Sequence, residues 1–316
     1  MRRRLPLIGM AALFVLGAAI VAGVVLGARS TESRSVAVAP GGAAATSFPA
    51  PPKGAVVFAR QDGSDALALA VRPQGQRLEL QTSVVGRQGT GVRGLSVAFR
   101  VQPGQAGSIR TTACGAGCYR ASAPLPSRPR TVTVEVARRN GKTVWRVPIE
   151  TWPPRPATEL LSRTERVWRN LRSFAFTEHL ASDADGGVDS TWKVVAPDRL
   201  SYEIPESGAA GIVIGNQRWD RQDGQWKKSQ QAPLDLPQAT WRPGVANAHV
   251  LGSGSVGGKP TDRVSFYDDD GRAWFEIDVE RRTGRTLDLH MATTAHFMRQ
   301  TFGRFNAPIV IHPPTR

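Results

Sequence analysis

The second half of the chain alternates between apolar and polar positions, a pattern typical of antiparallel strands with one buried face. The clearest hairpin lies in SFYDDDGRAWFEIDVE, where a turn at Asp270-Gly271 sets Phe266 opposite Phe275. The same register pairs Val264 with Ile277, Tyr267 with Trp274 and Arg263 with Asp278. Aromatic partners and opposite charges across a ladder each add about 0.2–1 kcal/mol, so both faces of the hairpin support this register.

The next turn, RRTGR, is predicted to have three loop residues with Gly284 in the left-handed conformation. That choice sets Val279 against Leu287, whereas a two-residue loop would oppose Leu287 to Glu280. One surface of the predicted sheet then collects Val264, Phe266, Phe275, Ile277, Val279, Leu287, Leu289 and Met291.

Two tryptophans flank another predicted turn, in GNQRWDRQDGQWKK. A type I′ turn at Asp223-Gly224 places Arg221 opposite Trp226. Side chains alternate along a strand, so Trp219 and Trp226 share one face. We expect this pair to belong to the wall or the rim of a pocket; the direction of the shared face is left open.

A single helix precedes these strands. In ATELLSRTERVWRNLRSF, the side chains of Leu160, Leu161, Trp168 and Leu171 recur at spacings that share one side. A helix of about 15 residues covers only part of a sheet of eight or more strands. Either the apolar residues form an ordinary core, or an apolar cleft remains beside the helix.

The first half of the chain predicts a separate domain. Short alternating segments such as RLELQTSVV and TVTVEVARR, with turn residues about every ten positions, predict a small antiparallel β-sandwich over residues 54–151. Residues 29–53, rich in Ala, Gly, Ser and Pro, predict a flexible linker. The prolines of TWPPRPAT separate this domain from a second one over residues 157–316.

Residues 5–28 form an uncharged run after three arginines. A helix of this length spans a bilayer core of about 30 Å, so we expect residues 1–28 to be a cytoplasmic tip and a retained transmembrane anchor; a cleaved signal peptide is the alternative. Basic residues stay on the cytoplasmic side. The expected location is the cell membrane, single-pass, with most of the chain extracytoplasmic.

The net charge of +15 is concentrated in the first half, where residues 1–151 carry 20 Lys and Arg against 6 Asp and Glu. This charge suits a solvated basic surface or one that faces anionic lipid headgroups. We expect no nucleic-acid partner, because the basic half has few aromatic residues for stacking.

Cys114 and Cys118 predict a disulfide bond, because residues 29–151 contain no His or Met that could complete a metal site. No nucleophile stands beside a matched base, so we expect neither an enzyme nor a cofactor. His290 is opposite Glu276 in the predicted register, and His296 follows one turn later, but lone strand histidines more often pair with a carboxylate than with a metal.

Residues 157–313 resemble the LolA/LppX-type fold of bacterial envelope proteins, which includes the lipid-binding half of RseB-like regulators. The segments that carry the resemblance are LRSFAFTEH, VVAPDRLSYEI, AGIVIGNQRWDR, GGKPTDRVSFYDDDGRAWFEIDVERRTGRTLDLHM and FGRFNAPIVIHPP. The resemblance implies an incomplete antiparallel β-barrel that wraps a helix and accepts an acyl chain in the cleft between them. Between Gln231 and His249, where relatives carry lid helices, this chain has a short stretch rich in Pro and Ala.

Residues 54–151 resemble YtkA-like immunoglobulin-type domains, in LALAVRPQGQRLELQTSVV and CGAGCYRAS. Such domains accompany bacterial copper-resistance proteins, but the His and Met ligands of a copper site are missing here.

The complete prediction is a mainly β protein: an N-terminal transmembrane helix, a small immunoglobulin-like β-sandwich, and a LolA-like incomplete antiparallel β-barrel that wraps a helix. Its expected role is to bind the acyl chain of a lipid or lipoprotein for envelope handling or sensing. The alternative is an interaction or regulatory module for a membrane protein partner, with no ligand in the cleft. The predicted ligand contacts are Val264, Phe266, Phe275, Ile277, Leu287, Leu289, Met291, Trp219 and Trp226.

Overall fold

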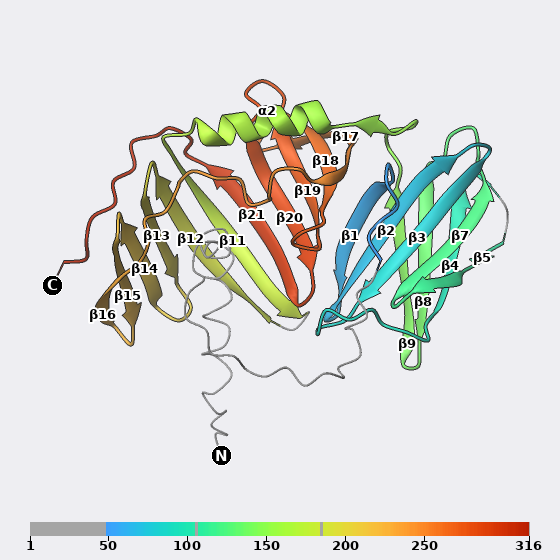
Figure 1. Cartoon of the computed structure of the whole chain (residues 1–316), viewed down its shortest axis with the longest axis horizontal. Coiled ribbons are helices and arrows are strands. Elements are labelled where there is room, and N and C mark those ends of the chain that lie inside the picture. The colour runs from blue at the N-terminus through green and yellow to red at the C-terminus, as the bar shows by residue number, and fades with distance from the viewer. Residues whose placement is uncertain (1–48, 105–106, 184–185, 316) are drawn as a thin grey trace, which may run out of the picture.

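The computed structural model describes residues 49–104, 107–183 and 186–315, which form two β-rich domains side by side (Figure 1). The fold is mainly β, as the sequence predicts. The predicted transmembrane anchor and most of the predicted linker lie outside the described residues. Within the described ranges, α2 (Thr158–Arg169) is too short and too polar to cross a bilayer, and no other helix there could do so.

The first domain is a sandwich of two antiparallel sheets. One sheet has the order β1-β2-β3-β7-β6 and the other β5-β4-β8-β9. The strands are β1 (Val56–Asp62), β2 (Asp65–Gln74), β3 (Arg77–Val85), β4 (Ser96–Gln102), β5 (Ile109–Arg110), β6 (Thr112–Gly115), β7 (Cys118–Pro124), β8 (Thr131–Arg138) and β9 (Gly141–Pro148). Alternate residues such as Leu69, Leu80 and Val134 fill the space between the sheets. The specific immunoglobulin-like assignment stays a prediction.

Cys114 and Cys118 form the predicted disulfide bond, which closes the tight turn between β6 and β7. One hairpin of this domain differs from expectation. The pair Asn140-Gly141 predicts a turn centred on those two residues, but Arg138 pairs with Gly141, so the loop is Arg139-Asn140.

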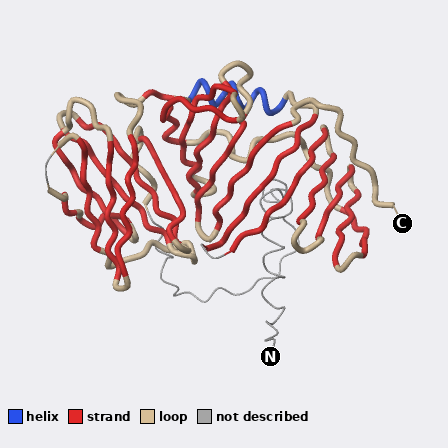
Figure 2. The backbone as a smooth tube through the Cα atoms, turned by 180° about the vertical axis from the view of Figure 1, so that it is seen from behind, coloured by secondary structure: helices blue, strands red, loops and turns tan. Residues whose placement is uncertain are grey.

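The second domain is a single antiparallel sheet of 12 strands within the described residues, in the order β10-β17-β18-β19-β20-β21-β11-β12-β13-β14-β15-β16. The strands are β10 (Arg155–Pro156), β11 (Ser173–Asp183), β12 (Gly186–Val195), β13 (Arg199–Ile204), β14 (Ala209–Ile214), β15 (Gln217–Gln222), β16 (Gln225–Gln230), β17 (Ala246–Val256), β18 (Lys259–Asp268), β19 (Ala273–Glu280), β20 (Thr286–Thr293) and β21 (His296–Gly303). The strand trace turns gradually across this sheet, and α2 runs along its upper end (Figures 1 and 2).

The β18–β19 hairpin has the predicted register, with Phe266 opposite Phe275 and Tyr267 opposite Trp274. In the next hairpin, Ile277 faces Leu289 as predicted, and Gly284 has a φ of 71°. The predicted pairing of Val279 with Leu287 is wrong. The register shifts between Asp278, which faces Asp288, and Val279, which faces Thr286, so Leu287 is the extra residue of a bulge in β20.

The two domains share an apolar contact. Val57 of β1 and small residues beside it pack against Tyr267, Trp274 and Phe297, which project from the convex face of the large sheet. The side chain of Asn247 adds hydrogen bonds to the nitrogen of Gly54 (3.1 Å) and the oxygen of Pro52 (3.0 Å). Strands β18–β21 are therefore covered on the convex face by the first domain.

Candidate functional site

Helix α2 covers one end of the concave face through its apolar side. Leu161 and Trp168 are buried in the main core of this domain. Trp168 meets the rings of Phe174 (4.9 Å between centroids) and Phe302 (5.1 Å) edge-on, and its Nε1 donates to Thr286 Oγ1 at 3.2 Å. Edge-to-face rings and a satisfied indole N–H fix the helix on the sheet.

The rest of the concave face is covered by residues 231–245, which connect β16 to β17 and which we call the strap. Leu234 and Trp241 of the strap are buried in the core, and Leu236 and Ala239 pack against it. Two main-chain hydrogen bonds hold the strap to its neighbours within the described part of the chain: the nitrogen of Gln231 donates to Asn216, and that of Leu236 donates to Pro197. Its prolines and lack of apolar periodicity leave it irregular.

A pocket of about 80 Å³ lies between the strap and the strands β11, β12, β13 and β21. Its lining is mainly apolar and aromatic. The lining residues are Trp168, Phe174, Phe176, Glu178, Leu180, Val194, Leu200, Asp235, Leu236, Gln238, Ala239, Thr240, His296, Met298, Gln300 and Phe302. Phe176 stacks on Trp192 with a ring separation of 5.6 Å, which makes a flat wall behind the lining.

Polar side chains occupy the middle of this lining. Gln300 Nε2 donates to Glu178 Oε2 at 2.7 Å, and Thr240 Oγ1 of the strap donates to Gln300 Oε1 at 3.0 Å. Ser190 Oγ approaches Glu178 Oε1 at 3.5 Å. Burial raises the pKa of the Glu178 carboxyl, and the hydrogen bonds from Gln300 and Ser190 oppose that shift only in part. These bonds tie the strap to the sheet.

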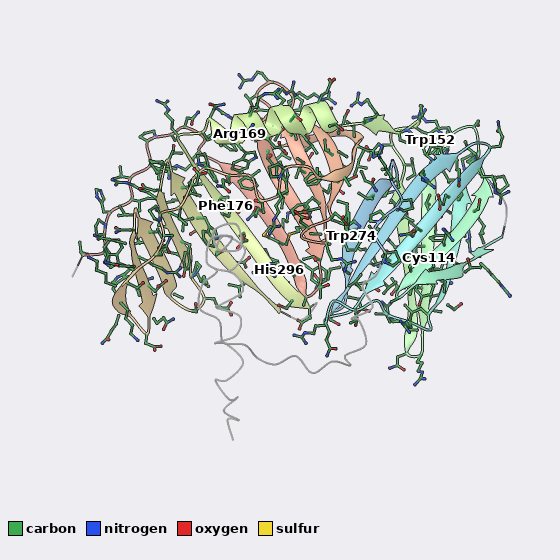
Figure 3. The ribbon with its side chains drawn as sticks, viewed as in Figure 1. Cys114, Trp152, Arg169, Phe176, Trp274 and His296 are labelled. Carbon is green, nitrogen blue, oxygen red and sulfur yellow. A yellow bond between two sulfur atoms is a disulfide. The ribbon has the colours of Figure 1, made fainter. Side chains whose placement is uncertain are left out.

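His296 lies at the far end of the pocket from α2. In Figure 3 it lies nearer than Phe176 to the lower ends of the strands. Its side chain is buried, and Nε2 has no hydrogen-bond partner among the described residues. Burial lowers the pKa of His296 from 6.5 to about 4, so the ring is neutral at physiological pH.

The structure places most of the predicted ligand contacts in the packed core, not in this pocket. Val264, Phe266, Phe275, Ile277, Leu289 and Met291 all belong to the main core cluster of the concave face. Leu287 is buried beside it, at the bulge. None of these seven lines the pocket beneath the strap. The predicted apolar face exists, and its side chains pack mainly on one another.

Trp219 and Trp226 share a face, as predicted, with Arg221 opposite Trp226. That face is the convex one. Trp219 pairs with Ile212, whereas the neighbouring Val213 points into the core of the concave side. Trp226 instead lines a groove of about 220 Å³ shared with residues 310–312 of the C-terminal segment. The direction of the shared face, which the sequence left open, is therefore away from the pocket beneath the strap, and neither indole lines that pocket.

A second cavity, of about 260 Å³, lies at the domain junction between β1 and the convex face. Its lining is more polar and includes Glu276, His290 and Arg299. His290 lies opposite Glu276, as the register predicts, but Nε2 of His290 contacts Asp288 at 3.3 Å. His296 points to the concave side instead, and the described residues contain no cluster that could hold a metal ion.

The pocket beneath the strap was missed at the sequence level for a specific reason. Its walls come from the strand SFAFTEHLAS, in which Phe174, Phe176, Glu178 and Leu180 alternate on one face. A glutamate at an apolar position of an alternating strand is the signal that could have identified it. The strap has no such signal.

No protein-family model and no curated protein matches this sequence. Among solved structures, the Mycobacterium tuberculosis lipoprotein LppX is similar with a TM-score of 0.38 and 11% identity, over 49% of this chain and 97% of LppX. LprF from Mycobacterium bovis gives 0.38 and 13%, over 51% and 97% of the two chains. A LolA superfamily protein from Nitrosomonas europaea gives 0.26 and 10%, over 49% and 95%. The neighbours thus belong to the group that residues 157–313 resemble.

Proposed function

We propose that this chain is an extracytoplasmic protein whose second domain binds a hydrocarbon chain of a lipid or lipoprotein beneath the strap. The observation that carries the proposal is the apolar, aromatic-lined pocket between the sheet and an irregular cover. Apolar pockets with a few converging polar groups are typical ligand sites. Two main-chain hydrogen bonds tie the cover to its surroundings within the described residues, so it is held mainly by side chains and can move.

Ligand entry requires the strap to move. The pocket holds about 80 Å³, whereas sites for drug-sized ligands hold about 300–1,000 Å³. An acyl chain therefore displaces Leu236 and Ala239, which fill the space in the closed state. The apolar side chains of the strap and the ligand compete for the same wall of the pocket. Movement of the strap away from that wall therefore favours ligand binding.

The location forms part of the proposal. Residues 5–28 would hold the chain at the cell membrane, with the basic first half near anionic headgroups. An anchored protein handles or senses lipid locally and does not shuttle it across the envelope. A membrane protein partner would receive or report on the ligand.

The test is native mass spectrometry of the full chain purified from its membrane, with extraction and identification of lipid. We expect co-purified lipid at close to one molecule per chain. Ala239→Phe fills the pocket from the strap and should remove that lipid. Ala232→Phe is the matched control, because Ala232 is on the same strap but exposed and away from the pocket.

The contrary outcome is a chain without lipid that also takes up no fluorescent fatty acid analogue. In that case the pocket is a packing defect, and the domain is an interaction module that acts through its surface.

A further inference from the structure

The polar residues in the pocket lining have an unusual composition. Glu178 is partly buried, and no Lys or Arg forms an ion pair with it within the described residues. Its hydrogen-bond partners are the uncharged side chains of Gln300 and Ser190. In its ionised form, a carboxylate without a nearby cation repels the carboxylate of a ligand and offers it no ion-pair partner.

The strap already supplies a hydroxyl group at this place. Thr240 Oγ1 donates to Gln300 Oε1 at 3.0 Å, and Gln300 in turn donates to Glu178. When the strap moves, Thr240 leaves, and the Gln300 oxygen loses this partner. An unpaired buried acceptor costs about 1–3 kcal/mol. A ligand hydroxyl would replace that of Thr240.

His296 provides a further unused partner in the same pocket. Its side chain is 5% exposed, and Nε2 is buried without a hydrogen bond. A neutral imidazole nitrogen donates or accepts one hydrogen bond, according to its tautomer. It can therefore bind an alcohol group.

We propose that this pocket selects amphiphiles whose polar end is an uncharged hydroxyl group over amphiphiles that end in a carboxylate, and that Glu178 determines this selectivity. The proposal rests on the proposed function, because it concerns the same pocket. It assigns Gln300 as the group that binds this hydroxyl, His296, four residues away on the same strand, as a partner for a second hydroxyl, and the aromatic residues near α2 as the groups that bind the alkyl chain.

The experiment compares 1-decanol with decanoate at neutral pH, as displacers of the uncharged fluorescent probe 1-aminoanthracene from the full chain held in amphipol. The two ligands have the same chain length and differ at the head. We expect the unaltered chain to bind decanol at least about tenfold more tightly, which corresponds to about 1.4 kcal/mol. Glu178→Gln keeps the shape of the side chain and its hydrogen bond to Gln300. The ratio of decanol affinity to decanoate affinity should therefore fall to about one or two.

Glu276→Gln is the matched control. Glu276 is a glutamate of the same sheet whose pKa is also raised by burial, but it lies at the domain junction on the convex face. Its substitution should leave the ratio unchanged. Thr240→Val is a second variant, which removes the strap hydroxyl and should tighten decanol binding severalfold.

The outcomes separate the two proposals. Equal binding of decanol and decanoate, or a ratio that Glu178→Gln does not change, overturns the selectivity and leaves hydrocarbon binding intact. Failure of both ligands and of the probe to bind overturns the proposed function and the selectivity together.

Discussion

The two halves of the concave face have similar side chains and different covers. Over β18–β20, Phe266 packs between Phe275 and Trp241 with ring separations of 5.1 and 5.4 Å. Over β11–β13 and β21, an equally aromatic surface that includes Phe174 and Phe176 retains a pocket. The difference comes from the side chains of the cover: the strap places the large indole of Trp241 over Phe266, but over the pocket it places the smaller Leu236 and Ala239.

The composition of an apolar surface therefore does not decide whether it becomes core or binding site. What decides is how completely the side chains of its cover fill the space above it. Over the pocket, the strap is held mainly by its side chains, including the hydrogen bond of Thr240 to Gln300.

The largest difference between the halves is expected from truncation. Phe266→Ala should lower the free energy of unfolding by about 3–5 kcal/mol, because it leaves a cavity that rigid neighbours cannot fill. Leu236→Ala in the strap should cost about 1 kcal/mol, because Leu236 is only partly buried. Denaturant unfolding of the two variants measures both values. Equal losses would mean that the strap is as rigid as the core.

Low pH should reduce the stability of the second domain, because protonation of the buried His296 in the pocket half favours the unfolded state. Its pKa falls from 6.5 in the unfolded chain to about 4 in the folded one, so the unfolded state binds a proton first as the pH drops. The stability contributed by neutral His296 is complete above pH 6.5 and declines by about 3 kcal/mol towards pH 4.

Glu178 acts with the opposite sign, because its raised pKa means that stability is lost as the pH rises through the folded value. Comparison of His296→Gln with the unaltered chain at each pH isolates the histidine. We expect the variant to have the flatter stability profile below pH 6.5. Parallel profiles would rule out a buried neutral ring.

Gly284→Val tests the fit of α2 at the packed half. The φ of 71° is unfavourable for a β-branched residue, and an added Cβ would lie 3.4 Å from Arg163 Nε and Val167 Cγ2 of the helix. We expect a loss of about 1–3 kcal/mol in thermal unfolding. Gly303→Ala serves as the control, since nothing lies near its Cβ position. A valine variant as stable as the unaltered chain would contradict the turn geometry.

The smallest effect should come from the convex face. Trp226→Ala removes a ring that lies 5.5 Å from the Arg221 guanidinium, which is worth about 0.5–1 kcal/mol. Ligand binding should not change, because Trp226 is on the opposite face from the pocket. A marked loss of ligand binding in the displacement assay would mean that Trp226 belongs to the ligand site.

Sequence periodicity predicted what depends on local pairing. The pairs Phe266–Phe275 and Arg221–Trp226 follow from alternation and turn chemistry, and both are present. Periodicity could not predict the bulge at Leu287, because a bulge adds one unpaired residue to a strand without changing the kinds of residue in it.

Nor could periodicity predict the direction of the face that carries Trp219. A strand pattern defines two faces but not which one the sheet curls around. The pocket depends on how the strap crosses β11 and β21, a contact between residues distant in sequence.

The apolar contact between the two domains has a consequence for how the large sheet can move. Strands β18–β21 are held between the concave core on one side and β1 of the sandwich on the other, with Tyr267 and Trp274 inside that second layer. Strands β14–β16, at the far edge of the sheet, have no such contact with the described residues of the first domain. If the sheet opens to admit a ligand, its far edge moves while strands β18–β21 stay in place, so the sandwich acts as a fixed support for that movement.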